Sequence, residues 1–189
     1  MPFIKGRQIL DPILISNECL DSRLRSGEPR VNCKMDLEKV YDHVNCDFLL
    51  YAWEVWFWED MVLLDRTLHF SVRFSILVNS SFNGIFSSSR GLRQGDPLSP
   101  LLFVFVMEAL SKMISTAVHG GLLEGFKVGN SSFSQLLFFY DTLIFCYAMP
   151  SQLRYLWSVF LLFKAASGLK VNLAKLVLIP VRNVEQVGM

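Results

Sequence analysis

The chain has 189 residues, enough for one domain with a buried core, and it is apolar for a soluble protein, with 52% hydrophobic and 19% charged residues. Its four cysteines are scattered without a CxxC pair, which argues against a zinc site and predicts reduced intracellular thiols. We expect no signal peptide, because the N-terminal segment lacks an apolar core, and we expect no membrane span, because charged residues interrupt the apolar stretches before the roughly 18–20 residues that a span needs. We therefore expect an intracellular protein, cytoplasmic or nuclear, without a membrane partner.

The pattern of apolar residues predicts a helix or a strand for most of the chain. In the first half the expected elements are a helix over 9–27, a strand over 31–37, a helix over 44–58, a strand over 71–79 and a turn at the sequence SSFNG. In the second half they are a helix from Asp96 to about Thr116, a buried hairpin over 136–148, a helix over 151–166 that ends before Gly168, and a strand or strand pair over 170–181. Asp96 is expected to be the N-cap and Pro97 the first-turn proline. The elements do not alternate regularly, which favours an α+β fold in which helices cover one face of an antiparallel sheet.

Charge is distributed unevenly along the chain, although the net charge is only +1. Residues 36–65 carry a net charge of −7, whereas residues 1–35, 66–144 and 145–189 carry +2, +2 and +4. An acidic block between basic flanks is consistent with a cation site that has a polyanion path around it. A solvated helix face is the alternative explanation for the same block.

The acidic block begins in the segment KMDLEKVYD, where Asp36 stands at the end of a predicted strand. Glu38, Tyr41 and Asp42 follow closely. Carboxylates gathered in one locality are candidates for binding a cation, but acidic strand ends and helix N-termini are also common in structural roles. This segment alone therefore does not define a site.

The segment SSSRGLRQGDPLSP, residues 87–100, combines Gly91 and Gly95 with Arg90, Arg93 and Gln94 ahead of a predicted helix. Glycines let the backbone approach a ligand closely, arginines supply donors for phosphate, and a helix N-terminus favours an anion. The alternative is a plain structural connection between a loop and a helix.

The segment FFYDTLIF holds a single carboxylate, Asp141, in an otherwise apolar run. A buried lone carboxylate costs several kcal/mol unless it is paired, protonated or bound to a metal. A hairpin here would bring Asp141 next to Asp36 on an adjacent strand. Carboxylates from two neighbouring strands suit paired Mg²⁺ ions, which prefer oxygen ligands and can clamp the oxygens of a phosphoryl transfer.

Together, these segments resemble the reverse-transcriptase domain of non-long-terminal-repeat (LINE-type) retrotransposons, particularly the plant-type elements. The similar segments are FIKGRQILDPILISNECLDSR in the fingers, KMDLEKVYDHVNCDFL as motif A, the stretch from SVRFSILVN to GLRQGDPLSPLLFVFVMEAL as motif B, QLLFFYDTLIFC as motif C and SGLKVNLAKLVL as motif D. The resemblance implies a polymerase palm with a partial fingers subdomain. It divides a single partial domain over 1–189 into a fingers fragment at about 1–30 and a palm with inserted fingers elements at about 31–180, and no thumb is expected.

The resemblance also implies an RNA-directed DNA polymerase that uses Mg²⁺, or Mn²⁺, with an RNA template, a DNA primer and a dNTP. It implies metal-binding catalytic roles for Asp36 and Asp141, a steric gate against a ribose 2′-hydroxyl at Tyr41, and protonation of the pyrophosphate leaving group by Lys175. The further residues implied to contact the nucleotide are Gln94, Gly95 and Arg93 in motif B and Lys5 and Arg7 in the fingers.

Motif C departs from the family pattern, which is Phe-Ala-Asp-Asp followed by Thr-Leu. Aligned without a gap, Phe139 replaces the alanine and Tyr140 replaces the first aspartate, the principal metal ligand there. With one residue deleted, Tyr140 takes the alanine position and one aspartate is left. One carboxylate is missing in either alignment, so weak or absent metal binding is expected, and the simplest hypothesis is a truncated, degenerate and catalytically defective copy.

Three functions fit the sequence: an RNA-directed DNA polymerase, a non-catalytic nucleic-acid-binding remnant that retains the basic surfaces, and an inactive pseudogene product. The first predicts Mg²⁺-dependent primer extension that fails in Asp36→Asn. The second predicts binding to primer–template that weakens steeply with salt and is indifferent to Asp36.

Overall fold

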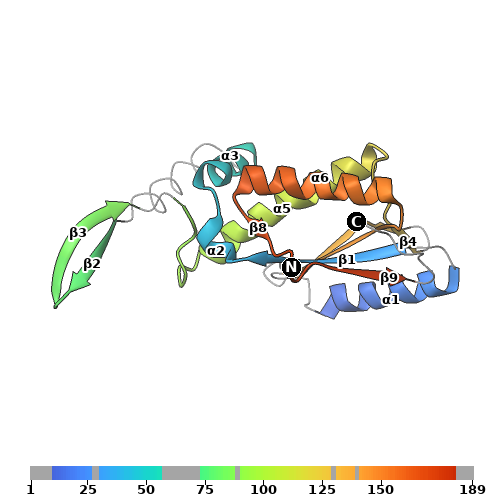
Figure 1. The fold of residues 1–189 in the computed structure, drawn as a ribbon, viewed down its shortest axis with the longest axis horizontal. Coiled ribbons are helices and arrows are strands. Elements are labelled where there is room, and N and C mark those ends of the chain that lie inside the picture. The colour runs from blue at the N-terminus through green and yellow to red at the C-terminus, as the bar shows by residue number, and fades with distance from the viewer. Residues whose placement is uncertain are drawn as a thin grey trace.

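A computed structural model describes residues 10–26, 30–56, 73–87, 90–128, 131–138 and 141–181 (Figure 1). Its helices are α1 (Leu10–Ser26), α2 (Val40–His43), α3 (Cys46–Trp56), α5 (Ser99–His119) and α6 (Pro150–Ser167). Its strands are β1 (Arg30–Glu38), β2 (Arg73–Val78), β3 (Ser81–Ser87), β4 (Phe126–Val128), β5 (Ser131–Phe133), β6 (Gln135–Phe138), β7 (Asp141–Tyr147), β8 (Lys170–Val171) and β9 (Val177–Val181). The predicted Lys5, Arg7, Phe139 and Tyr140 lie outside the described residues.

Strand β1 lies at the centre of the main sheet and is paired along both of its edges. On one edge, Arg30–Asp36 pair antiparallel with β7, and β6 lies beyond β7. On the other edge, β9 pairs with the first part of β1 and β8 pairs with its end. Because both edges are paired, the register of β1 is fixed from two sides, and so is the face on which each of its residues lies.

Hydrophobic cores cover both faces of this sheet. Cys33 and Met35 of β1 belong to the larger core, which is built with α3, α5 and α6. On the opposite face, Phe145 of β7 packs in a smaller core with Cys19 of α1 and with Phe126. The antiparallel α+β architecture is confirmed, with most helices on one face as expected, and α1 adds a layer on the other (Figure 1).

Helix α5 forms the centre of the larger core. Among the described residues, it is the one helix that is long and apolar enough to cross a membrane by length and composition. Leu102, Val106, Leu110 and Ile114, spaced one turn apart, are fully buried, and α5 contacts both α3 and α6. Burial within this core accounts for the apolar residues of this stripe.

Strands β2 and β3 form a separate hairpin that projects away from the main sheet (Figure 1). Its turn consists of Asn79 and Ser80, which have φ angles of 48° and 66°. The turn predicted at SSFNG therefore lies earlier than expected: Ser80 belongs to it, but Ser81 already begins β3. Gly84 instead has a φ of 72° where the pairing is irregular, so it serves a β-bulge and not the turn.

Helix α5 also begins later than predicted. The Asp96 carboxylate accepts a hydrogen bond from the Leu98 backbone N–H at 2.9 Å, and the helix starts at Ser99. Asp96 therefore closes a turn ahead of the helix and is not its N-cap. Pro100, and not Pro97, occupies the first helical turn.

Candidate active site

Two of the predicted catalytic residues are brought together by the pairing of β1 with β7. Asp36, near the end of β1, is directly opposite Asp141, the first residue of β7. Opposed residues of antiparallel strands lie on the same face of a sheet. This juxtaposition agrees with the expectation drawn from the two sequence segments.

The segment between β8 and β9 lies against Asp36 because it interrupts the pairing along that edge of β1. Strand β8 pairs with Leu37 and Glu38, β9 pairs with Arg30–Lys34, and the connection 172–176 is longer than continuous pairing needs. The extra length forms a turn, held by a hydrogen bond from the Lys175 backbone N–H to the Asn172 carbonyl at 3.1 Å. Asn172 also donates its backbone N–H to the Asp36 carbonyl at 2.9 Å.

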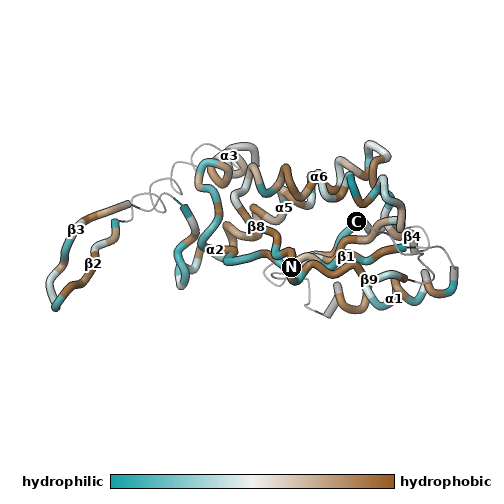
Figure 2. Tube along the Cα trace, in the orientation of Figure 1, coloured by the Kyte–Doolittle hydropathy of each residue, from teal (hydrophilic) through white to brown (hydrophobic). Residues whose placement is uncertain are grey.

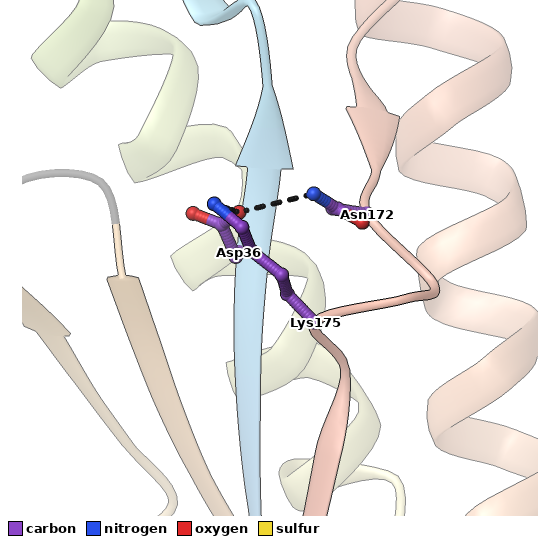
Figure 3. A network of polar contacts seen from close by, with 3 residues as sticks. All are labelled: Asp36, Asn172 and Lys175. Carbon is purple, nitrogen blue, oxygen red and sulfur yellow. Dashed lines mark hydrogen bonds and ion pairs between the residues drawn. The ribbon is translucent and has the colours of Figure 1, made fainter.

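Two side chains of this turn reach the Asp36 carboxylate (Figure 3). Lys175 Nζ lies 3.3 Å from Asp36 Oδ2, and Asn172 Nδ2 donates a hydrogen bond to the same oxygen at 3.4 Å. Lys175 is 69% exposed, whereas Asp36 is 17% exposed. Asn172 was not among the predicted site residues. The only sequence signal for it is its position in VNLAK, close to Lys175.

The short helix α2 presents Tyr41 next to this site. Lys39 has a φ of 41°, and this left-handed residue separates β1 from α2. The Tyr41 ring is half-buried and packs at a tilt against Phe103 of α5, with the ring centroids 6.1 Å apart. Phe103 of α5 therefore supports the ring of Tyr41, the predicted steric gate.

Two glycines hold α2 in place through close backbone contacts. A Cβ at Gly91 would lie 2.8 Å from the Tyr41 carbonyl oxygen, and one at Gly168 would lie 2.6 Å from the His43 carbonyl oxygen. Backbone hydrogen bonds run from Gly91 to Val44 at 2.9 Å and from Asn45 to Ser167 at 2.7 Å. Motif A is thus held between the motif B loop on one side and the end of α6 on the other.

Motif B contributes Gln94 to the same corner. Gln94 Nε2 donates a hydrogen bond to Asp42 Oδ1 of α2 at 3.4 Å. A pocket with a volume of about 470 Å³ opens here. Its lining residues are Asp36, Leu37, Glu38, Lys39, Val40, Tyr41, Gln94, Asn172 and Lys175.

The pocket therefore unites Asp36, Tyr41, Gln94 and Lys175, four of the predicted site residues, from motifs A, B and D. The remaining motif B residues, Arg93 and Gly95, are exposed and are not among the lining residues. Gly95 has a φ of 85° with no atom near the place of a Cβ, so its backbone conformation is what requires glycine.

The acidic groups at this corner make a small donor set for a metal. The described residues contain no group of three or more His, Cys, Asp or Glu side chains arranged to hold a metal ion. Mg²⁺ is commonly bound through one or two carboxylates together with substrate phosphates. Asp36 is a carboxylate of that kind that lines the pocket on β1, and the strand register places Asp141 opposite it.

An antiparallel sheet covered by helices, with two aspartates opposite each other on its central strands, is the architecture of a polymerase palm. The family described as reverse transcriptase (RNA-dependent DNA polymerase) matches residues 1–189, and the chain belongs to this family. Enzymes of this family generally use divalent metal ions.

Curated relatives include proteins of mobile elements. The chain is 45% identical over 76 residues to an uncharacterized mitochondrial protein of Arabidopsis thaliana, a match that covers 39% of this chain. It is 25% identical over 122 residues, 64% of this chain, to an uncharacterized 149 kDa protein of transposon TX1 from Xenopus laevis. It is 36% identical over 90 residues, 48% of this chain, to the Pol polyprotein of the type-2 retrotransposable element R2DM from Drosophila melanogaster. The matches span 61%, 9% and 8% of these three proteins, respectively.

Solved structures with a similar fold include yeast telomerases. Apo telomerase of Candida tropicalis superposes with a TM-score of 0.66 at 14% identity, covering 96% of this chain and 36% of that one. Telomerase of Candida albicans, in complex with a fragment of telomeric RNA, gives a TM-score of 0.67 at 14% identity, covering 92% of this chain and 30% of that one. At this identity the likeness shows the fold alone.

Proposed function

We propose that this chain is the palm region of an RNA-directed DNA polymerase of a non-LTR retrotransposon, and that this copy is catalytically defective. The observation that carries the proposal is that Asp36, which lies opposite Asp141 in the strand register, lines a pocket together with Tyr41, Gln94 and Lys175. A pocket of about 470 Å³ is large enough for a nucleotide-sized ligand.

In this proposal the residues of the chain bind and orient a dNTP and the end of a DNA primer paired to an RNA template. Tyr41, backed by Phe103, limits the space beside the sugar and so favours a deoxyribose. Gln94, held by Asp42, packs against the base pair being formed. Lys175, on its exposed turn, is placed to give a proton to the departing pyrophosphate.

Asp36 and Asp141 would hold a divalent ion, Mg²⁺ or Mn²⁺. When bound, such an ion supplies positive charge to the phosphate oxygens of the reaction. Tyr140 stands where a further carboxylate is expected, and a neutral phenol cannot offer the same charge at pH 7. The defect in this copy is therefore assigned to one missing negative charge at the metal site.

Primer extension on an RNA template, first with Mg²⁺ and then with Mn²⁺, tests this proposal. The samples are the natural chain, Asp36→Asn, and the repaired variant Phe139→Ala/Tyr140→Asp, with Lys112→Gln as a control away from the pocket. We expect no extension by the natural chain, extension by the repaired variant, and none when Asp36→Asn is added to the repair.

Each alternative result has a definite meaning. Extension by the natural chain that is lost in Asp36→Asn would overturn the proposed defect and show that one motif C carboxylate suffices. If the repaired variant gives no primer extension although its circular dichroism and unfolding match those of the natural chain, the assignment of the defect to Tyr140 is overturned.

A further inference from the structure

The Asp36 carboxylate already has a positively charged partner within the chain. Lys175 Nζ lies 3.3 Å from Oδ2, and the Asn172 amide donates to the same oxygen at 3.4 Å (Figure 3). Asp36 is 17% exposed, so its charge is less well screened by water than that of a surface aspartate. A cation that binds Asp36 therefore meets a lysine that is already in place.

The position of Lys175 is set by the backbone and not by its flexible side chain alone. The turn is tied to β1 by the hydrogen bond from the Asn172 N–H to the Asp36 carbonyl, and it is closed on itself by the bond from the Lys175 N–H to the Asn172 carbonyl. Strands β8 and β9 anchor it on both sides. The ammonium group is thereby held at a high local concentration beside the carboxylate.

The ammonium group of Lys175 opposes the binding of a divalent ion at Asp36. A dication next to Asp36 is attracted by the carboxylate and repelled by the ammonium group, and both interactions act over a few ångströms. With Tyr140 in place of an aspartate, one carboxylate fewer is available to outweigh that repulsion.

We propose that Lys175 is a built-in competitor for divalent cations at Asp36, so that the natural chain closes its own metal site with an internal ion pair. The inference rests on the proposed role of Asp36 as a metal ligand. It concerns binding alone, so it does not depend on the chain having any polymerase activity. We expect Asn172 to keep its hydrogen bond to Asp36 when Lys175 is replaced, so that the competing charge is removed while the carboxylate stays oriented.

Mn²⁺ binding to the full chain, without nucleic acid or nucleotide, tests the proposal. Electron paramagnetic resonance of free Mn²⁺ gives the dissociation constant directly. The variants are Lys175→Gln, the matched control Lys112→Gln, which makes the same change of charge at an exposed lysine of α5, and both Asp36→Asn and Asp36→Asn/Lys175→Gln. Lys175 is 69% exposed, so its replacement leaves the core intact.

We expect Lys175→Gln to bind Mn²⁺ about fivefold more tightly than the natural chain, in line with the upper range of exposed ion pairs. Lys112→Gln should bind as the natural chain does, and the gain should vanish when Asp36→Asn is present. An equal gain in Lys112→Gln, no gain in Lys175→Gln, a gain that persists without the Asp36 carboxylate, or no detectable binding by Lys175→Gln would each overturn the proposal. The primer-extension result is scored separately, so failure of one proposal is distinguishable from failure of the other.

Discussion

The main sheet and the β2–β3 hairpin use similar residues and reach opposite degrees of burial. In the sheet, Val31, Cys33 and Met35 are buried, and helices lie on both faces. In the hairpin, Ile76, Leu77, Val78, Phe82, Ile85 and Phe86 are all exposed, with Phe82 at 80%. Figure 2 shows hydrophobic segments in both regions.

The difference teaches that strand propensity and burial are separate properties of a sequence. Ile76, Leu77 and Val78 are consecutive apolar residues, a pattern typical of a strand that is covered on both faces. An isolated two-stranded hairpin is marginally stable at best. Of the contacts within the hairpin, the stacking of Phe74 on Phe86, with the ring centroids 5.8 Å apart, is the clearest source of cohesion.

The largest expected effect contrasts one phenylalanine from each region. Phe145 is 1% exposed and packs against Phe126 with the ring centroids 4.7 Å apart, so Phe145→Ala should lower the free energy of unfolding by about 3–5 kcal/mol. Phe82→Ala, in the hairpin, should change it by less than about 0.5 kcal/mol. Unfolding in urea measures both. Equal losses of unfolding free energy in the two variants would mean that the hairpin is buried in solution, and would contradict the difference in burial between the two regions.

A second contrast uses two glycines with nearly the same backbone conformation. Gly168 and Gly84 have φ angles of 75° and 72°, but a Cβ would meet the His43 carbonyl oxygen at 2.6 Å in the first case and no atom within 4 Å in the second. Gly84→Ala should lower the free energy of unfolding by about 1 kcal/mol, because alanine is disfavoured in the left-handed conformation. Gly168→Ala should cost about 1–3 kcal/mol more, because the backbone around α2 must shift.

Urea unfolding of both glycine variants at the same pH gives this difference. If the two losses are the same, the close contact between Gly168 and α2 does not contribute, and the description of α2 as held between two glycines fails.

The smallest expected effect is a pH dependence that belongs to the main sheet. Burial raises the pKa of Cys33 from 9.0 to about 12, with the neighbouring Cys146 adding to it, and burial raises the pKa of Cys146 to about 11, against the opposing effect of Arg30. Because the folded pKa values exceed the unfolded ones, the folded state keeps these thiols neutral. Their contribution to stability is complete below pH 9, where the unfolded thiols are also protonated, and is lost as the pH rises from 9 towards 11 and 12.

Unfolding free energies at pH 8, 9 and 10 check the sign of this dependence. Above pH 9, the titration of each thiol should lower the free energy of unfolding by up to about 1.4 kcal/mol per pH unit. Cys33→Ala serves as the control, since it removes one of the two titrations while lysines and tyrosines titrate in both proteins. The natural chain should therefore lose stability more steeply than Cys33→Ala, and parallel slopes would contradict the prediction.

Much of the fold follows from local signals in the sequence. Alternation predicted β1, helical spacing predicted α1 and α6, and Gly168 was correctly expected to end α6, where it adopts the left-handed conformation with a φ of 75°. These features depend on a few neighbouring residues and on side-chain period, which the sequence displays directly.

The errors arose where one residue type serves two purposes. Gly84 suggested a turn but sits in a bulge, and Asp96 suggested a helix cap but closes a turn two residues before Leu98. Gly84 does adopt a positive φ and Asp96 does accept a backbone hydrogen bond, as expected for these residue types. The secondary-structure element to which each belongs is not the expected one. Which role is taken depends on pairing across the hairpin and on packing of α5, neither of which is local.

For the candidate site, the ordered motifs predicted which residues gather, and the structure brings Asp36, Tyr41, Gln94 and Lys175 to one pocket. Asn172 was missed because asparagine in a polar turn carries no distinctive signal. Its importance comes from the break in pairing between β8 and β9, which is visible only when the register of three strands is known.

The pairing of β1 along both edges also determines how far the position of Asp36 depends on its own side chain. Strand β1 is paired with three strands, and the Asp36 carbonyl also accepts a hydrogen bond from the backbone N–H of Asn172, so the location of Asp36 owes little to its own side chain. A chain built in this way can lose catalytic side chains one at a time without losing its architecture.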